Sequence, residues 1–587
     1  MAGKIDLKEL YPSDEEFLKS LETIKKDIEN YQYFEGHLYD SAKNLYDFLE
    51  FDTKISKELE KLYTYAHINS DLDLSNTKYQ EYVGKVLSLI EQIEEKTAFA
   101  TPEILLKDYD YILNLIKLYP KLSEYRLMLK KIFRLKEITR TKEEEELINT
   151  LTTSYDKPEE ISEMLINTDL KYGTIKDENN KEIELTNSNY STYFESAYRN
   201  VRKSAFNAVY KEFKEHAHTF GTILNTEVIN NNRIAKIRNF TSARDLSLFR
   251  NEVNPSIYDN LIKGVHNNLN RFFKYFDLKK DILGLDELHI YDTYANITKK
   301  YDKTYSYDDA KKIVLGSLAI LGNNYISNLN KAFDNNWIDS TICKTKRSGA
   351  YATAAYTAHP YVVLSYEGKV NDISTLAHEL GHAMHYQYAI QTNNFQYYNY
   401  SIFVAEVASQ VNEILLTDYL FKKSNDTEEK KYLLDMMLQR FKATIVRQTM
   451  FAEYEQNIHN LEKDGVILTP ERLEDEYYKL NELYFGKNVV VDNEIRYECY
   501  RIPHFYYDFY VYQYATGYAA AMKIANDILS GKEGAVEKYL DFLTLGSTKD
   551  PVESLKVAGV DIEDEKIYDE VFMVFENKLK ALRSLYE

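Results

Sequence analysis

Apolar and charged residues recur at helical spacing over most of the chain. Between residues 13 and 150, as in SAKNLYDFLEFDTKISKELEKLYTYAHI, apolar residues stand three and four positions apart, which is typical of helices that bury one face. The spacing returns from about 190 to 336 and again after 370. Because only nine prolines occur in 587 residues, few of these helices are interrupted. The pattern predicts a mainly α-helical protein.

Three short segments depart from this pattern. Residues 171–186 (KYGTIKDENNKEIELT) alternate apolar and polar residues around a polar turn and predict a β-hairpin. Residues 288–297 predict an extended stretch, and 361–366 (YVVLSY) predict a strand. A chain of this length exceeds one compact core, so we expect more than one lobe. We place an N-terminal helical region ending in the hairpin at 1–190 and a second domain at 191–587.

Composition narrows the class of protein. There are 73 Lys and Arg against 93 Asp and Glu, a net charge of 73 − 93 = −20, which argues against a generic nucleic-acid binder and against attraction to anionic membranes. The N-terminus has no apolar signal core, and no stretch of about 18 apolar residues occurs. With only Cys343 and Cys499, a disulfide framework is excluded. We expect a soluble protein of the cytoplasm.

The segment TLAHELGHAMHY carries an H-E-x-x-H motif. On a helix, His378 and His382 share one face and can direct two imidazoles at one metal ion. Glu379 stands about 100° around the helix, where it can reach a metal-bound water without ligating the metal. Apart from Glu379, residues 373–390 are uncharged, as expected of a buried active-site helix. Asp372 is the expected N-cap.

Zinc catalysis needs a third protein ligand and an open fourth position. His385 stands seven residues after His378, about 10 Å along the axis, so we interpret it as a core residue or as support for a ligand. Glu406 is a lone carboxylate in the apolar segment SIFVAEVASQVNEIL and is costly to bury unless it is paired or ligating. It follows His382 by 406 − 382 = 24 residues, enough for a loop and a returning helix. Glu413 is either a supporting carboxylate or an exposed acid.

A tyrosine-rich segment, YECYRIPHFYYDFYVYQYATGY, follows downstream. Eight of its 22 residues are Tyr, and it contains His504. If a helix begins near Phe505, one stripe consists of Tyr507, Tyr510, Tyr514 and Tyr518. Such a stripe is more often core packing, yet buried hydroxyls need partners, and a peptidase needs neutral or cationic donors for the developing oxyanion.

These motifs resemble oligoendopeptidase F, of the thimet-oligopeptidase-like family of zinc metallopeptidases. The resemblance rests on TLAHELGHAMH, FVAEVASQVNE and RIPHFYYDFYVYQYATGYAAAM. KRSGAY, HPYVVLSYEG, YDTYA and the hairpin segment are also similar and occur in the same order. The resemblance extends from about residue 110 to about 570. It implies a large two-lobed helical zincin fold, with a deep substrate channel and a small β element near the active site.

The resemblance also implies chemistry, with residues 191–587 as the catalytic domain. One zinc ion per chain would be held by His378, His382 and Glu406, with Glu379 as general base for water attack on internal bonds of short peptides. The groups that stabilise the transition state match His504, Tyr507 and Tyr514. Val511 stands where the thimet branch has another tyrosine, which leaves Tyr510 or Tyr512 as alternatives.

Peptide binding is predicted around the strand 361–366, by pairing with the substrate backbone, and at a loop that precedes it. The predicted substrate-binding residues are Gly349, Ala350, Tyr351, Val362, Leu364 and Tyr510. Packing of the strand in the core is an equal alternative. The partners expected are short peptides, without nucleic acid or membrane, and the protein is expected as a monomer or weak homo-oligomer.

Two other functions stay open. An exopeptidase on a similar helical zincin fold would need a charged group, such as Arg347 or Arg501, to bind a substrate terminus. A helical interaction protein with a vestigial motif would bind no stoichiometric zinc. The joint presence of His378, Glu379, His382 and Glu406 speaks against the second.

Overall fold

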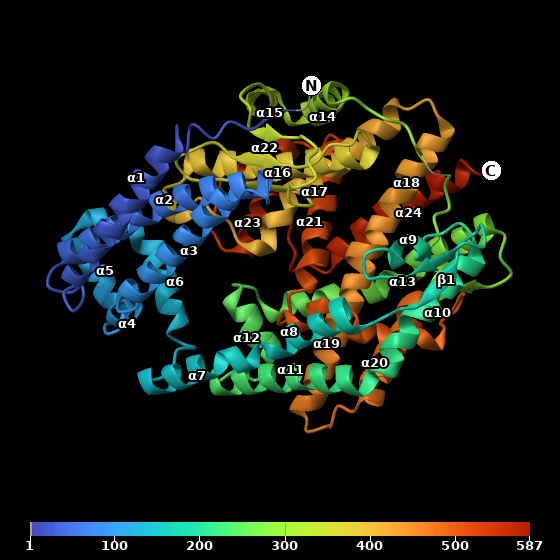
Figure 1. Ribbon diagram of the computed structural model, residues 1–587, viewed down its shortest axis with the longest axis horizontal. Helices are drawn as coiled ribbons and strands as arrows, with labels where there is room; N and C mark the ends of the chain where they lie inside the picture. The colour runs from blue at the N-terminus through green and yellow to red at the C-terminus, as the bar shows by residue number, and fades with distance from the viewer. Residues whose placement is uncertain (1–2, 300) are drawn as a thin grey trace. The chain divides into compact units, whose positions relative to one another are not determined.

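The computed structural model describes residues 3–299 and 301–587, and most of them lie in α-helices (Figure 1). This confirms the mainly α class. The chain forms two compact units of three segments each. Unit 1 comprises Met1–Glu137, Asp302–Leu420 and Ile524–Gly559, and unit 2 comprises Ile138–Tyr301, Phe421–Lys523 and Val560–Glu587. The boundary predicted at residue 190 lies inside unit 2, because segments far apart in sequence complete each unit.

Unit 1 begins with helices whose starts are set by serine caps. The Ser13 and Ser41 side chains accept backbone N–H groups of the first turns of α1 and α2. In the core beside them, Phe17 stacks on Tyr65 and Tyr82 with ring centroids 5.3 and 4.7 Å apart. The helices of this segment are α1 (Asp14–Asp27), α2 (Ala42–Leu72), α3 (Thr77–Thr97), α4 (Ala100–Ile104), α5 (Tyr109–Leu118) and α6 (Arg126–Leu135), labelled in Figure 1.

The later segments of unit 1 supply further helices and a small sheet. The helices are α14 (Tyr307–Leu318), α15 (Asn323–Asp334), α16 (Val370–Thr392), α17 (Ile402–Lys423), α22 (Ala535–Leu543) and α23 (Pro551–Val557). The strands are β4 (Ile338–Asp339), β5 (Tyr351–Thr353) and β6 (Tyr361–Val363), in the order β4-β6-β5, with β4 parallel and β5 antiparallel to β6. Helix α16 packs against β5 and β6, which confirms a small β element beside the motif helix.

Unit 2 is helical apart from two short sheets. Its helices are α7 (Lys142–Tyr155), α8 (Lys157–Met164), α9 (Tyr190–Phe194), α10 (Arg199–Glu215), α11 (Ala217–Ile237), α12 (Ala243–Arg250), α13 (Pro255–Leu283), α18 (Thr427–Phe441), α19 (Arg447–Lys463), α20 (Pro470–Phe485) and α24 (Lys566–Ser584), together with α21 (Tyr512–Leu529) as far as Lys523. Strands β1 (Thr174–Lys176) and β2 (Glu182–Glu184) form the predicted hairpin. Strand β3 (Leu288–His289) pairs with β7 (Val489–Val490), but Ile290–Tyr294 is a 3₁₀ turn, so the predicted extended stretch is shorter than expected.

Neither cysteine forms a disulfide. Cys343 is exposed and Cys499 is buried, and both are free thiols. No helix in the described ranges combines the length and the apolar character needed to cross a bilayer.

Candidate active site

The two histidines of the motif lie one turn apart on α16. Asp372 is the third residue of this helix, not the N-cap that we expected. Its carboxylate accepts the backbone N–H groups of Glu367 at 3.0 Å and Lys369 at 2.9 Å, so it holds the start of the helix from inside the first turn. From there, His378 and His382 follow on one face.

A glycine allows α17 to approach α16 closely enough to deliver Glu406. A Cβ atom on Gly381 would lie 2.5 Å from the Cα of Ser409 and 2.7 Å from the carbonyl oxygen of Ala408. Asn412 on α17 donates to a backbone carbonyl of α16 at 3.0 Å and ties the two helices together. Sequence reasoning did not single out Gly381, although a glycine inside a helical pattern costs about 1 kcal/mol relative to alanine and signals a packing reason.

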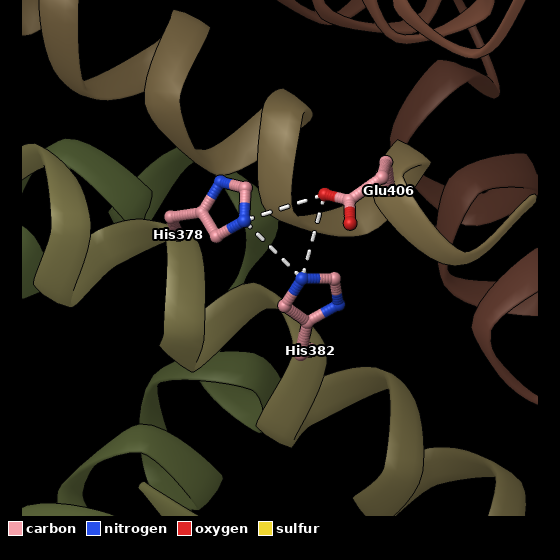
Figure 2. A group of neighbouring side chains, drawn as sticks. All are labelled: His378, His382 and Glu406. Carbon is pink, nitrogen blue, oxygen red and sulfur yellow. Dashed lines mark hydrogen bonds and ion pairs between the residues drawn. The ribbon is translucent and has the colours of Figure 1, made fainter. Parts of the chain in front are cut away.

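The side chains of His378, His382 and Glu406 point toward one another (Figure 2). The two Nε2 atoms are 3.2 Å apart, and Glu406 Oε2 lies 3.3 Å from Nε2 of His378 and 3.5 Å from Nε2 of His382. In a tetrahedral zinc site with bonds of about 2.0–2.1 Å, ligand atoms are about 3.3–3.4 Å apart. The three donors therefore fit a metal ion, and over the described part of the chain they are the one such group.

The charges around these donors favour a cation. Burial alone would lower the pKa of His378, but hydrogen bonds to Glu406 and Glu413 outweigh burial and raise the pKa to about 10. Burial would raise the pKa of Glu406, but the two histidines hold it well below its usual range. The carboxylates thus favour positive charge at this point, and a divalent cation supplies it while leaving both imidazoles neutral, as ligands must be.

Glu413 supports the ring of His378 from its far side. Its Oε1 lies 3.6 Å from Nδ1 of His378 and accepts the hydroxyl of Ser374 at 3.3 Å. A carboxylate facing the second nitrogen of a ligating imidazole fixes the ring orientation and tautomer. Glu413 is 7% exposed, so its alternative interpretation as an exposed acid is wrong.

His385 takes no part in the metal group. Its ring is 1% exposed and stacks on Tyr400, with centroids 3.6 Å apart and planes 4° apart. The ring of Phe542 lies 5.1 Å away on α22. Burial lowers the pKa of His385 to about 3. It is a neutral core ring, one of the two interpretations that the sequence allowed.

Glu379 lies beside the metal group in a buried position. Glu379 is 6% exposed. Burial raises its pKa, while His378 and His382 act in the opposite direction. A carboxyl group whose pKa is shifted toward neutrality can take up and release a proton at working pH. Glu379 thus has the electrostatic setting of a general base.

His504 and Tyr514 come together in unit 2. His504 lies in the 3₁₀ turn Pro503–Tyr506, and Tyr514 lies in the first turn of α21. Nε2 of His504 is 3.3 Å from the hydroxyl of Tyr514. Burial lowers the pKa of His504, so its imidazole is neutral at physiological pH. We call residues 504–514 the tyrosine loop.

The tyrosine stripe depended on a helix beginning near Phe505, but the helix begins only at Tyr512. Asp508 and Phe509 have φ angles of +47° and +60°, in the left-handed region that side chains with a Cβ rarely adopt. A right-handed helix cannot continue through them. The expected stripe of Tyr507, Tyr510, Tyr514 and Tyr518 is therefore not carried by one helix.

The tyrosines of the loop differ in surroundings. Tyr507 is 37% exposed, with its ring edge-on to His504 at 5.3 Å. Tyr510 packs edge-on against Tyr514 at 5.2 Å. Tyr512 is 0% exposed and belongs to the core. Tyr514 is the tyrosine whose hydroxyl meets the His504 ring.

The residues predicted to bind peptide divide between a strand centre and a strand edge. Val362 on β6 and Leu364 just after it are 0% and 1% exposed, and β6 pairs with strands on both sides. This corrects the choice of strand, because β6 has no open edge for a peptide. In this sheet β5 is an edge strand, which pairs with β6 on one side only. It contains Tyr351 and follows Ala350 and Gly349, whose φ is +91°.

Comparison with known proteins identifies the class. Residues 192–574 match the model of peptidase family M3, and residues 103–172 match the model described as Oligopeptidase F. The chain therefore belongs to peptidase family M3. Within this family it is a metallo-oligopeptidase.

Named relatives and solved structures agree over nearly the full length. The chain is 39% identical to Oligopeptidase PepF of Bacillus subtilis strain 168 over 99% of this chain and 86% of the relative. It is 37% identical to an oligoendopeptidase F homolog of Lactococcus lactis, over 99% and 97%. At 32% identity, it matches the crystal structures of a putative peptidase from Chlamydophila abortus (TM-score 0.94, 99% and 98% covered) and of oligoendopeptidase-F from Enterococcus faecium (TM-score 0.75, 98% and 99%).

Proposed function

We propose that the metal of this peptidase is zinc, one ion per chain, held by His378, His382 and Glu406. The observation that carries the proposal is the 3.2–3.5 Å spacing of the three donor atoms. Two imidazoles and one carboxylate are a donor set of catalytic zinc sites, which keep one position open. A bound zinc ion supplies a Lewis acid that polarises the scissile carbonyl group and makes water more acidic.

Glu379 is the general base in this proposal. It removes a proton from the attacking water and passes that proton to the leaving amine, and both transfers need a carboxyl whose pKa is raised toward neutrality. Burial raises the pKa of Glu379 in this way, against the opposing effect of the two motif histidines. Glu413 keeps the ring of His378 oriented throughout.

His504 and Tyr514 are proposed as donors to the oxyanion that develops on the substrate. The support is chemical: a neutral imidazole and a phenol hydroxyl, 3.3 Å apart, are held in one polar pair. Tyr507 and Tyr510 are further candidates, because their rings pack against this pair.

The peptide backbone is proposed to pair with the edge of β5 that lies away from β6. Tyr351 and the turn at Gly349 and Ala350 would then face the peptide, while Val362 and Leu364 support β5 from the core. Backbone pairing tolerates many sequences, as a peptidase of varied short peptides requires.

We further propose that the enzyme acts in the cytoplasm as a monomer or weak homo-oligomer. Its two free cysteines suit a reducing compartment.

The test uses an internally quenched peptide blocked at both ends, because only an endopeptidase cleaves it. We expect the wild type to cleave it in a chelator-sensitive way and to contain one zinc per chain. Glu379→Gln should keep the zinc and lose activity by about 10²-fold or more, since the amide cannot accept the proton. Wild-type turnover in that variant would refute the base assignment, and cleavage of unblocked peptides alone would indicate an exopeptidase.

A further inference from the structure

Glu455 is a carboxyl group enclosed in the core of unit 2 with one unused oxygen. It lies on α19 and is 0% exposed. Its Oε1 accepts the backbone N–H of Phe509 at 2.8 Å, whereas Oε2 has no hydrogen-bond partner within the described residues. A buried polar atom left unpaired costs free energy, so packing gives no reason for an acid here. Its one hydrogen bond goes to the tyrosine loop.

That hydrogen bond holds one end of a strained peptide group. The peptide joins Asp508 to Phe509, the two residues with left-handed φ angles. Its other end, the carbonyl of Asp508, accepts the hydroxyl of Ser247 on α12 at 2.6 Å. Backbone in this conformation persists only where surrounding contacts determine it. Here Glu455 and Ser247 clamp both ends of the same peptide group.

The groups around Glu455 disfavour a negative charge on its carboxyl. The Phe509 ring is 1% exposed and lies 4.7 Å from the ring of His459. Nδ1–H of His459 donates to the carbonyl of Glu455 at 2.8 Å, and burial lowers the pKa of this histidine to about 4. Burial raises the pKa of Glu455 well above its usual range, with Asp508 and Glu227 adding to the effect. Burial thus favours the uncharged form of Glu455, and its Oε1 is held in place as the acceptor of the Phe509 N–H.

The clamped peptide lies midway between the two donors. Phe509 is five residues after His504 and five before Tyr514, and the loop folds back at this point to bring the two side chains within 3.3 Å. Without the clamp, the left-handed pair would relax, and the loop would sample other conformations.

We propose that Glu455 is a positioning residue, which fixes the Asp508–Phe509 peptide group so that His504 and Tyr514 meet. The inference rests on the donor role proposed for these two side chains. Glu455 itself touches neither substrate nor metal; it acts through the backbone of the loop. Ser247 acts in the same way from the opposite end of the peptide group.

The test compares two substitutions of Glu455 in the full-length zinc enzyme. Glu455→Ala removes the acceptor, so kcat should fall by about 10-fold or more, as for a misplaced oxyanion donor. KM should change by less than about threefold, and the zinc content should stay at one per chain, because the ligands lie in unit 1. Glu455→Gln keeps an acceptor oxygen in place and should restore kcat to within about twofold of wild type.

Glu453 offers a matched control on the same helix. Its carboxylate accepts the hydroxyl of Tyr484 and pairs with His266, both at 2.7 Å. Glu453→Ala therefore removes a carboxylate with two partners without touching the loop, and should lower the melting temperature but not kcat.

Should Glu455→Ala fail to fold, Ser247→Ala removes the other end of the clamp with a smaller change, and the same fall in kcat is expected.

Hydrogen exchange separates the possible failures. Amides of residues 505–511 should exchange faster in Glu455→Ala than in wild type or Glu453→Ala. Unchanged exchange overturns the clamp, and faster exchange with wild-type kcat overturns the positioning role. A glutamine variant as impaired as alanine also overturns it. If Tyr514→Phe keeps wild-type kcat, the proposed donor role itself has failed, which the exchange data distinguish from failure of the clamp.

Discussion

Gly381→Ala tests how closely α16 and α17 must approach for the metal group to form. The added Cβ would lie 2.5 Å from the Cα of Ser409, whereas carbon atoms in contact are about 3.5–4.0 Å apart. The nearest atoms are backbone, so rotation of a side chain cannot relieve the overlap. The helices must separate locally by about 1 Å.

A shift of this size matters more to the metal than to folding. Overpacking costs about 1–3 kcal/mol, and replacing a helical glycine returns about 1 kcal/mol, so the net loss of stability is small. Metal–ligand distances tolerate only about 0.2 Å. Glu406 lies one turn before Ser409 on α17 and would move with it, so zinc affinity should fall by about 10–100-fold.

The assay is competition for zinc with a chromophoric chelator, read beside kcat/KM and the melting temperature. Gly84→Ala is the matched control, because Gly84 is also inside a helix, α3, but a Cβ there meets no atom within 4 Å. The control should gain about 0.5–1 kcal/mol of stability and keep its zinc affinity. Wild-type zinc affinity in Gly381→Ala would refute the argument that close helix contact places Glu406.

Two other predictions follow from burial and charge. Glu406→Ala should lower the zinc-to-protein ratio after dialysis. Glu413→Gln should lower it less, because Glu413 faces the second ring nitrogen of His378 and is not one of the three metal-facing donors. An unchanged ratio in Glu406→Ala would move the third ligand elsewhere. Burial raises the pKa of Glu227 to about 8. Between about pH 4.5 and 8, the Glu227 carboxyl is therefore protonated in the folded state and ionised in the unfolded state. The free energy of unfolding should fall by a few kcal/mol as the pH rises through this range. Glu227→Gln should remove this loss, raising the urea midpoint at pH 9 but not at pH 5; equal shifts at both would contradict the assignment.

Local spacing explains why the helices and the metal ligands could be predicted. His378 and His382 must share a helix face, and the burial cost of Glu406 among apolar neighbours points to it as a partner. Both arguments need only residues close in sequence. The hairpin, too, is a local signal, and it appears as β1 and β2.

Features set by long-range contacts could not be predicted in this way. A single aspartate is a weak turn signal, and the left-handed backbone of Asp508 and Phe509 depends on Glu455 and Ser247, which lie 54 and 261 residues from the atoms that they bind. The central place of β6 depends on pairing with β4 and β5, which periodicity does not reveal. The composition of the two units from three segments each was equally out of reach, because a boundary drawn along the sequence assumes that domains are consecutive.

The late position of α22 has a consequence for the timing of synthesis. This helix packs against α16, with Phe542 beside His385 and the hydroxyl of Tyr539 within 3.5 Å of the carbonyl of Ala408. Residue 543 leaves the ribosome 543 − 382 = 161 residues after the motif, a delay of about 8–30 s at about 5–20 residues per second. The metal-binding unit is therefore incomplete while most of the chain is nascent.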